Sequence, residues 1–594
     1  MLADLPPEII QHIAANLPTL NALVSLARTC RRLYKILADD RVYRTFIRNR
    51  FPNVETPPFW KDAAKALTAR SRALDRCGVI GRFVVPSQDA RVIGVAQSTR
   101  RDRPTLGHRP SIDSFECWTG DRWEDRKEVL AWGAGAEIII RLRSTGKNAK
   151  QQCLKFNDLE DYSSRDDICG VHVLRPEHQS KQDDKLHIIY GRFNGSVDHI
   201  AISPEDGSYE HRQSFNTYWR DTSRLDLSSG PEPILSAQSS SGIWLYRTTT
   251  DDFEVQPFAN LETVVTAEGA SPYHSKFLSP NRIAVGVSGR SNYLAIADIA
   301  NERISTVRNM LFDDGTRRIP GLDFIAPLNS QIPGHGAPGE LFLSGWRMSQ
   351  VRLVDTRSPR PYEQEYLDNT DFNSVYCIQP LGHCFLVGTG GNALIKVFDL
   401  RMPSSYNYLD AKPSVSLNRG YFSPSIQKLT AEANGVSPNG RLPRADYNCF
   451  LSHEVHTTGQ RRRRNNRWTP RRYTGPIYTM SSPSATSATV YAGIVGGVVR
   501  VDFACTDDLT GIDGAWYRDR FGLDKSSSYD EADQRILQLA GYERPLPNDE
   551  TSPVILRNQA ALEEVTENDI RREMATGVDR RWRRSNEDSK DKRW

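Results

Sequence analysis

The fold of this chain is decided by the stretch LFLSGWRMSQVRLVDTR, residues 341–357. An apolar run at 341–343 and a second one around Val351 and Val354 flank a turn of small and polar residues. Short runs of this kind on both sides of a turn are typical of a β-hairpin. The hairpin ends on Asp355.

The same order of strand, turn and strand recurs six more times. The other copies lie at 129–143, 186–202, 234–247, 283–298, 385–401 and 490–502. The four clearest copies end on Asp298, Asp355, Asp399 and Asp502, and the first two gaps, of 57 and 44 residues, are close to the ~40–50 residues of a propeller blade. Hairpins without intervening helices favour a β-propeller over alternating strands and helices. Seven copies predict seven blades; six or eight blades, or another all-β fold, are the alternatives.

The ends of two copies resemble the ends of WD repeats. These are Val354-Asp355-Thr356-Arg357 and Phe398-Asp399-Leu400-Arg401. The Trp that precedes Asp in that family is replaced by Ala297, Val354, Phe398 and Val501. The resemblance therefore implies a degenerate, WD-like propeller.

The first fifty residues have a helical pattern instead. Ile9, Ile13 and Leu17 fall on one helical face, with Pro7 in the first turn and Pro18 at the end. A second helix is predicted over 23–37 and a short third helix over 42–47. Three helices in about fifty residues bury little surface alone.

Several segments of this module, in order, resemble the F-box motif. They are LPPEII at 5–10, Leu23 with Leu26, TCRRLY at 29–34, and Asp40 with Tyr43. The resemblance implies that the module docks on the small adaptor subunit of a cullin–RING ubiquitin ligase. The residues that it assigns to this contact are Leu5, Pro6, Ile9, Leu23, Leu26, Cys30 and Leu33. An unrelated helical cap on the next domain is the alternative, and the pattern alone does not divide these residues between core and interface.

The chain is thus expected to have several domains. We predict a small all-α F-box at 1–50, a helical linker at 51–78, an all-β propeller at 79–525 with a long insert at 403–475, and a partly helical, charged tail at 526–594. In the tail, helices are predicted over 532–540 and 560–574, and the basic run at 580–584 is predicted to be disordered.

Three of the predicted blade turns carry an arginine. Arg192, Arg290 and Arg347 each follow a second strand, and these turns would converge on one rim of the propeller. Three guanidinium groups there would suit an acidic or phosphorylated segment of a protein substrate, because arginine binds such groups with paired hydrogen bonds. Solvated turn arginines are the alternative.

The insert contains a dense cluster of positive charge. Arg461–464, Arg467, Arg471 and Arg472 place seven arginines within twelve residues. Nuclear import and contact with nucleic acid are two interpretations, and Trp468 and Tyr473 could stack on bases. A solvated loop between blades is the favoured interpretation, so a nucleic-acid partner is not expected, and the location is predicted as cytoplasm, nucleus or both.

The composition of the 594 residues excludes several classes. The 77 basic and 73 acidic side chains nearly balance. No apolar run reaches the ~18 residues of a membrane span, so no membrane association is expected. The nine cysteines are scattered without a Cys-x-x-Cys pair, which favours a reducing compartment over a disulfide framework or a zinc ribbon.

No catalytic motif is evident in the sequence. His453 and His456 lie three residues apart but lack a third metal ligand. We therefore expect neither a metal nor a cofactor, and a subunit that is not itself an enzyme. The combined resemblances imply the substrate-recognition subunit of an SCF-type ubiquitin ligase, in which the F-box binds the adaptor and the propeller binds the protein to be ubiquitinated for degradation. A propeller scaffold that assembles a complex outside the ligase is the alternative.

Overall fold

The computed structural model describes most of the chain between residues 2 and 584. The ranges not described are 103–108, 146–149, 179–183, 262–270, 289–292, 312–320, 329–336, 401–446, 456–470, 524–535, 544–554, 563–577 and 585–594, with positions 1, 18, 53, 88, 301–302, 348, 369–370, 372, 452–453, 473–474 and 512.

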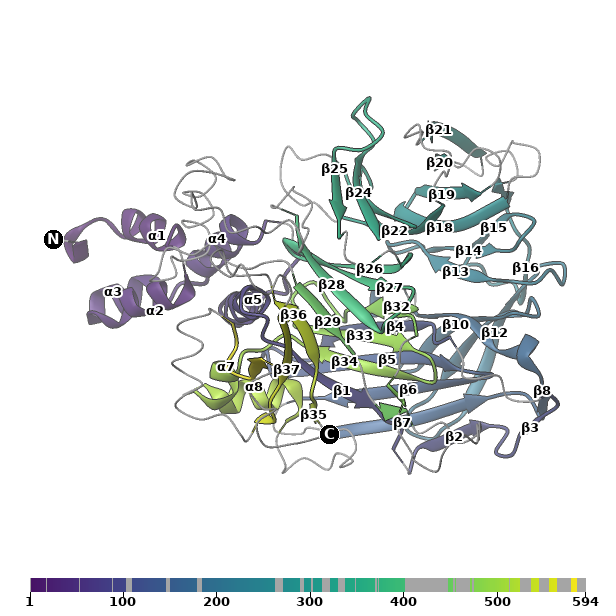
Figure 1. The fold of residues 1–594 in the computed structure, drawn as a ribbon, viewed down its shortest axis with the longest axis horizontal. Helices are drawn as coiled ribbons and strands as arrows, with labels where there is room; N and C mark the ends of the chain where they lie inside the picture. Colours follow the sequence, from purple (N-terminus) through teal and green to yellow (C-terminus); the bar gives the residue numbers. More distant parts are fainter. Residues whose placement is uncertain are drawn as a thin grey trace.

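A bundle of short helices forms the N-terminal module, at the left of Figure 1. After a 3-10 turn at Leu2–Asp4, the helices are α1 (Pro7–Ala15), α2 (Leu20–Arg28), α3 (Arg31–Leu37) and α4 (Asp40–Arg50). Their core contains Ile10, Leu23, Leu37 and Phe46, all fully or almost fully buried. The helical module that the sequence predicts is confirmed.

Two details of this module differ from the predictions. The helix predicted over 23–37 is divided into α2 and α3, because Cys30 has an extended backbone and its Sγ accepts a hydrogen bond from Leu33 N. The buried face of α1 carries Ile10 and Ala14 rather than Ile9, which is exposed. The apolar run Ile9-Ile10 offers two faces, and only the packing of α4 and α3 against α1 selects one.

A long helix joins this module to the strands. Helix α5 (Trp60–Asp75) contributes Ala63 and Leu67 to the core of the N-terminal module and Ala73 and Leu74 to a core beneath the β-strands. Small alanines along one stripe allow the helix to lie close to both. The linker is therefore part of two cores at once.

Seven sheets follow, antiparallel except for the outer strands of the first two, and we number them as blades in chain order. Blade 1 is β4 (Ile112–Trp118), β5 (Arg126–Ala134), β6 (Glu137–Ser144) and β7 (Lys150–Asn157), with β2 (Arg91–Gly94) at its outer edge. Blade 2 is β9 (Ile168–Val173), β10 (Leu186–Arg192), β11 (Val197–Ile202) and β12 (Tyr209–Phe215), with β16 (Glu254–Val255) outside. Blade 3 is β13 (Arg224–Leu227), β14 (Ile234–Gln238), β15 (Ile243–Arg247) and β17 (Ala259–Asn260).

The remaining blades have the same plan. Blade 4 is β18 (Ser271–Ser279), β19 (Arg282–Ser288), β20 (Tyr293–Ala300) and β21 (Arg303–Leu311). Blade 5 is β22 (Leu322–Pro327), β23 (Leu341–Trp346), β24 (Gln350–Asp355) and β25 (Gln364–Leu367). Blade 6 is β26 (Val375–Leu381), β27 (Cys384–Thr389), β28 (Leu394–Asp399) and β29 (Tyr447–Phe450), extended by β36 (Ala540–Glu543), β37 (Ile555–Gln559) and β38 (Trp582–Arg584).

Blade 7 closes the ring with strands from both ends of the chain. It contains β32 (Thr479–Ser481), β33 (Thr489–Ile494), β34 (Gly497–Asp502), β1 (Ile80–Val84) and β35 (Ile536–Leu537). Strand β1 pairs with β34, with Ile80 opposite Asp502. The first strands of neighbouring blades contact one another around a complete circle, from β4 through β9, β13, β18, β22 and β26 to β32 and back to β4. The fold is therefore a seven-bladed propeller (Figure 1).

The repeated hairpin of the sequence is the second and third strand of each blade. All seven predicted copies occupy this position, and their strands pair in antiparallel register. The four repeated aspartates lie at equivalent sites, since each is opposite the first residue of its second strand or within one residue of it. The prediction of seven WD-like blades is confirmed.

Six further short elements of the described chain, in two strand pairs and two 3-10 turns, lie outside the blades. They are β3 (Thr99–Arg100) paired with β8 (Asp161–Tyr162), β30 (Glu454–Val455) paired with β31 (Arg471–Arg472), and the 3-10 turns Ser164–Asp166 and Pro176–His178. Two helices, α7 (Thr506–Thr510) and α8 (Gly514–Phe521), follow blade 7 and pack near α5. Among the described residues, none of the helices is long and apolar enough to cross a bilayer.

The C-terminal region differs from its prediction. The described part of the helix predicted over 532–540 forms β35 and the start of β36, and most of 560–574 lies outside the described residues. The basic run at 580–584 is ordered, because Trp582 is buried and its Nε1 donates to Cys77 O at 2.7 Å. The burial of one tryptophan orders this segment although its neighbours are charged. The pattern of charges alone does not predict this.

Candidate functional site

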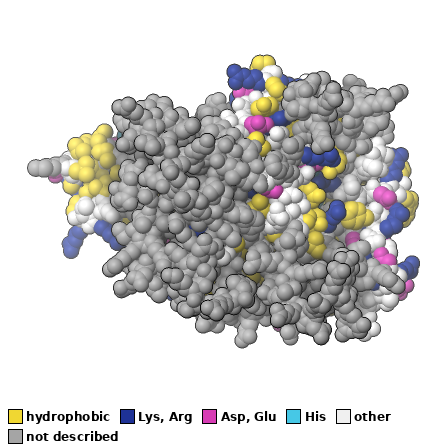
Figure 2. Space-filling model, viewed as in Figure 1, with side chains coloured by type: hydrophobic (Ala, Val, Ile, Leu, Met, Phe, Trp, Pro, Cys, Tyr) yellow, Lys and Arg dark blue, Asp and Glu magenta, His cyan; other side chains and the backbone are white. Residues whose placement is uncertain are grey.

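The N-terminal helices expose an apolar surface. Leu2, Ile9 and Tyr34 have exposed fractions of 40, 48 and 59%, and Pro6 and Cys30 are exposed beside them in sequence. Figure 2 shows apolar side chains gathered at the end of the molecule away from the propeller, with basic side chains next to them. Exposed apolar residues that cluster in this way mark interaction sites.

The structure divides the seven residues predicted to bind the adaptor. Leu23 and Leu33 are buried in the helical core, and Leu5 and Leu26 are partly buried against it. Pro6, Ile9 and Cys30 are exposed. Only the last three, with the accessible edges of Leu5 and Leu26, can contact a partner directly, whereas Leu23 and Leu33 hold the helices that present them.

Two residues of this surface are not among those that the sequence assigned to the adaptor contact. Tyr34 lies in α3 and is more exposed than Ile9, and Leu2 lies in the first turn. Tyr34 belongs to the TCRRLY segment of the motif. An aromatic side chain at helical spacing is more often buried than exposed, so the sequence does not assign Tyr34 to the surface. Only the packing of α3 shows that it faces outward.

Polar contacts fix helix α5 to blade 7 and to the segment of α7 and α8. Arg70 is buried, and its Nη1 donates to Ala485 O at 2.6 Å and to Ser487 O at 2.8 Å. Burial lowers the pKa of Arg70 to about 10, which still leaves the guanidinium charged at neutral pH. Arg72 pairs with Asp508 of α7, and Lys65 Nζ lies 3.3 Å from Asp513 Oδ2. These contacts fix the direction in which the N-terminal helices leave the propeller.

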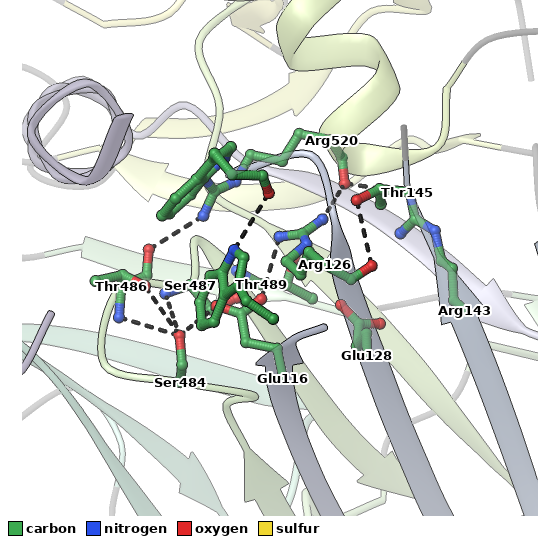
Figure 3. A network of polar contacts seen from close by, with 12 residues as sticks. Glu116, Arg126, Glu128, Arg143, Thr145, Ser484, Thr486, Ser487, Thr489 and Arg520 are labelled. Carbon is green, nitrogen blue, oxygen red and sulfur yellow. Dashed lines mark hydrogen bonds and ion pairs between the residues drawn. The ribbon is translucent and has the colours of Figure 1, made fainter. Parts of the chain in front are cut away.

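A second polar network joins blade 1, blade 7 and α8 (Figure 3). Arg126 Nη1 lies 3.1 Å from Glu116 Oε2, and its Nη2 donates to Arg520 O at 3.0 Å. The Ser484 hydroxyl donates to the other oxygen of Glu116, and Arg520 Nη2 donates to Thr486 O at 3.2 Å. Because the groups come from three separate parts of the chain, the network stabilises the seam where the ring closes.

One side of the propeller carries the turns between the second and third strands and the connections that enter each first strand. We call this side the turn face. Helix α5 contacts the segments 482–488 and 503–505 of blade 7, which lie at the other ends of the strands. The N-terminal helices and the turn face are therefore on opposite sides of the ring.

Exposed aromatic side chains concentrate on the turn face. Five of the exposed large apolar residues lie in its turns or at the start of first strands: Phe193, Tyr218, Trp219, Tyr273 and Tyr376. Exposed arginines lie there too, namely Arg109, Arg165, Arg220 and Arg347. Aromatic residues and arginine are the types enriched at protein–protein interfaces.

The three arginines predicted to converge on a ligand do not form one site. Arg192 is 2% exposed, its Nη1 donates to Ala136 O and Asp166 O at 3.0 and 2.7 Å, and its Nη2 lies 2.5 Å from Asp158 Oδ1. It connects blade 2 to blade 1 and offers no surface to a ligand, which corrects the prediction for this residue. Arg290 lies outside the described residues.

Arg347 does lie on the turn face, at the end of β23. Its side chain is more than half exposed, and its Nε lies 4.0 Å from Asp323 Oδ1. Burial raises the pKa of Asp323, so this carboxyl is a weaker counter-charge than a solvated one. Arg347 remains accessible to a ligand, but without Arg192 as a neighbour.

Two other sequence features fall largely outside the described residues. Arg461–464, Arg467, Trp468, His453 and His456 are among the residues not described. Arg471 and Arg472 form the short strand β31. The interpretations of the basic insert remain predictions.

Comparison with protein families gives a specific match for the N-terminal module. The sequence model of the F-box-like family matches residues 2–49. This range contains the 3-10 turn at Leu2–Asp4 and helices α1–α4 except for the last residue of α4. The chain therefore carries an F-box-like domain. Comparison with curated proteins gives no match.

Three solved structures illustrate the similarity of the chain to known folds. Raptor of Chaetomium thermophilum has a TM-score of 0.38 at 11% identity, over 79% of this chain and 32% of that one, so this chain spans about a third of its length. Saccharomyces cerevisiae Sqt1 has a TM-score of 0.36 at 15% identity, over 63 and 80% of the two chains. The WD40 β-propeller domain of Doa1 has a TM-score of 0.35 at 11% identity, over 72 and 95%. The propeller assignment rests on the closed circle of blades rather than on these scores.

Proposed function

We propose that this chain, an F-box-like domain followed by a WD-like propeller, is a substrate-recognition subunit of a cullin–RING ubiquitin ligase. The F-box-like helices would bind the small adaptor subunit, and the turn face would bind the protein to be ubiquitinated. No catalytic group is required of this chain, because it acts by holding the target near the ubiquitin donor and so raises the local concentration of target lysines.

The observation that carries this proposal is the exposed apolar surface of the F-box-like domain. Ile9 and Tyr34 remain about half exposed although Leu23, Leu33 and Phe46 beneath them are buried. Leaving such side chains in water gains nothing for the isolated module, whereas burying them on a partner is favourable by about 25 cal/mol per Å² of apolar surface. A partner that binds this surface accounts for its composition.

The position of the two surfaces supports the second half of the proposal. The turn face points away from α5, and α5 is anchored to blade 7 through Arg70 and to the segment of α7 and α8 through Arg72 and Lys65. A substrate on the turn face would therefore be held at a defined distance from the adaptor. A flexible connection would lose part of this advantage, because effective concentration falls as a linker becomes longer and looser.

Binding of a purified adaptor subunit tests the first half. The double variant Ile9→Glu/Tyr34→Glu should bind the adaptor at least tenfold more weakly in a titration, since two carboxylates would be desolvated in the contact. The variant Phe253→Glu is a matched control, because Phe253 is equally exposed but lies on blade 2's outer side, next to β16. Full adaptor binding by the double variant would show that this surface is not the docking site.

Recovery of the ligase subunits from cells distinguishes the proposal from the scaffold alternative. Tagged wild-type chain should recover adaptor, cullin and RING subunits, and the double variant should recover none of them. Recovery of the adaptor without cullin would instead support a complex outside the ubiquitin ligase.

A further inference from the structure

The connection between β12 and β13 presents two aromatic side chains from a strained backbone. Tyr218 and Trp219 both have positive φ angles, 55 and 58°, and exposed fractions of 53 and 87%. Two consecutive residues other than glycine in the left-handed region cost free energy and persist only where the surroundings fix them. Trp219 is also the most exposed large apolar residue in the described part of the chain.

The surroundings do fix this connection. The Thr217 hydroxyl donates to Gly195 O at 2.6 Å, the Tyr246 hydroxyl donates to Asn216 O at 2.9 Å, and Tyr218 N donates to Asn216 Oδ1 at 2.9 Å. Gly195 has a φ of 99°, and a Cβ there would lie 2.4 Å from Arg220 O. The loop is thus packed against the neighbouring turn of blade 2, and Trp219 is held outward before any ligand arrives. Such preorganisation lowers the entropy cost of binding.

A recess lies directly beside Trp219. It is lined by Trp219, Arg220 and Asp221 on one side and by the β14–β15 turn, Ser239, Ser240 and Ser241, on the other. The recess is shallow and largely open to solvent. Ser240 and Ser241 are exposed, so their hydroxyl groups can donate to a ligand, whereas Ser239 is buried and bonds to Ser241 across the turn.

The charges of the recess favour an anionic group. The Arg220 guanidinium lies 4.7 Å from the ring centroid of the buried Trp244, which orients it by a cation–π contact. The carboxylate next to it, Asp221, pairs with Arg165. Among the described residues, the ion pairs therefore leave Arg220 with its positive charge available, next to two serine hydroxyl donors and an indole face.

The geometry points to this recess as the substrate-docking site of the turn face, for a protein segment that carries a large apolar side chain next to an anionic one. The apolar side chain stacks on Trp219, and the anionic group, a carboxylate or a phosphate, receives hydrogen bonds from Arg220 and the Ser240 and Ser241 hydroxyls. This inference rests on the proposed function for its biological role, but the binding chemistry stands on the recess itself.

Synthetic peptide arrays test this specificity with the purified full chain. Degenerate twelve-residue peptides carry Phe or Leu at one position and Asp, Glu, phosphoserine, Ser or Lys at the adjacent positions. We expect capture on the anionic peptides and none on the Ser and Lys peptides. Capture confined to phosphoserine assigns the anion to a phosphate, and equal capture on Asp and Glu assigns it to a carboxylate. Capture that ignores the charge overturns the proposal.

Three variants assign the binding to the recess, with fluorescence anisotropy on the best peptide as the readout. Trp219→Ala should weaken binding at least tenfold. Arg220→Glu should reverse the preference from anionic to Lys peptides, which structural damage would not do. Phe253→Ala removes an exposed aromatic side chain elsewhere and should leave the dissociation constant unchanged. Unchanged binding by Trp219→Ala, or loss of all binding by Arg220→Glu without reversal, overturns the proposal.

The adaptor titration keeps this result separate from the proposed function. Trp219→Ala should bind the adaptor as tightly as the wild type. Peptide binding without adaptor binding would retain the recess and remove the ligase role, whereas adaptor binding without peptide selectivity would do the reverse.

Discussion

At the scale of single residues, the same side-chain type has different roles in one short module. Leu23 is fully buried, and Ile9 is about half exposed, although both belong to the same motif. A buried leucine stabilises the fold, and an exposed isoleucine is available to a partner. The two roles should separate in experiments that measure stability and binding independently.

Leu23→Ala should lower the free energy of unfolding of the helical module by about 2–5 kcal/mol, because it leaves a cavity in the core. Ile9→Ala should change it by less than about 0.5 kcal/mol, since about half of the side chain is already in contact with water and its loss leaves no closed cavity. Chemical unfolding followed by far-ultraviolet circular dichroism measures both. Equal losses for the two variants would contradict the assignment of core and surface.

Glu128 illustrates how a charged residue stabilises the ring seam. Burial by itself would raise its pKa, but Arg500, Arg143, Arg126 and Arg141 lower it to about 2 from its usual 4.5. A carboxyl whose pKa is lower in the folded state contributes stability above its unfolded pKa, and this contribution is lost as the pH falls toward the folded pKa. The window therefore runs from about pH 4.5 down to about pH 2.

Glu128→Gln should thus be less stable than the wild type at pH 7 by about 3 kcal/mol, and this difference should shrink between pH 4.5 and 2. Urea unfolding of both proteins at pH 7, 5, 4 and 3 measures the difference. A difference that stays constant over this range would show that the arginines do not hold the carboxylate in its charged form.

At the scale of elements, α5 and the C-terminal segment together form the junction of the two domains. The Trp582 indole reaches Cys77 O, Asp579 N donates to Arg76 O at 2.8 Å, and Arg581 Nη1 donates to Val79 O at 3.4 Å. These contacts close around the residues between α5 and β1. A segment that its charge predicts to be disordered is therefore part of the structural junction.

Trp582→Ala should cost about 3–5 kcal/mol in unfolding free energy, as for other large buried side chains. Trp219→Ala makes the same substitution at an exposed site and should stay within about 0.5 kcal/mol of the wild type. Thermal unfolding compares the two variants directly. If Trp582→Ala unfolds at the wild-type temperature, the tail does not support the junction.

At the scale of the whole molecule, the propeller depends on its N-terminal strand. β1 lies between β34 and β35 in blade 7, so residues 80–84 close a ring whose other strands in that blade come from beyond residue 478. A ring closed in this way has no long unpaired edge at its seam. Helix α5 joins the F-box-like domain to this closing strand, which ties the position of the domain to the closure.

A truncated chain of residues 58–594 should fold, because it retains α5 and β1. A chain of residues 86–594 should not give a cooperative unfolding transition, because β34 keeps β33 but loses β1 on its other edge, and the core beneath α5 is exposed. Calorimetry of the two purified chains tests this. A sharp transition for the shorter chain would mean that the ring closes without β1.

The sequence by itself determined the seven hairpins and the F-box-like, helical character of the first fifty residues, because each depends on patterns within ten to twenty residues. Only the tertiary structure decided which apolar residues are exposed, that Arg192 is buried between blades, that Trp582 fixes the tail, and that Trp219 stands beside an open recess. These outcomes depend on contacts between segments tens to hundreds of residues apart. The burial of a residue depends on which segment packs against it. The spacing of apolar residues along the chain does not indicate which segment that is.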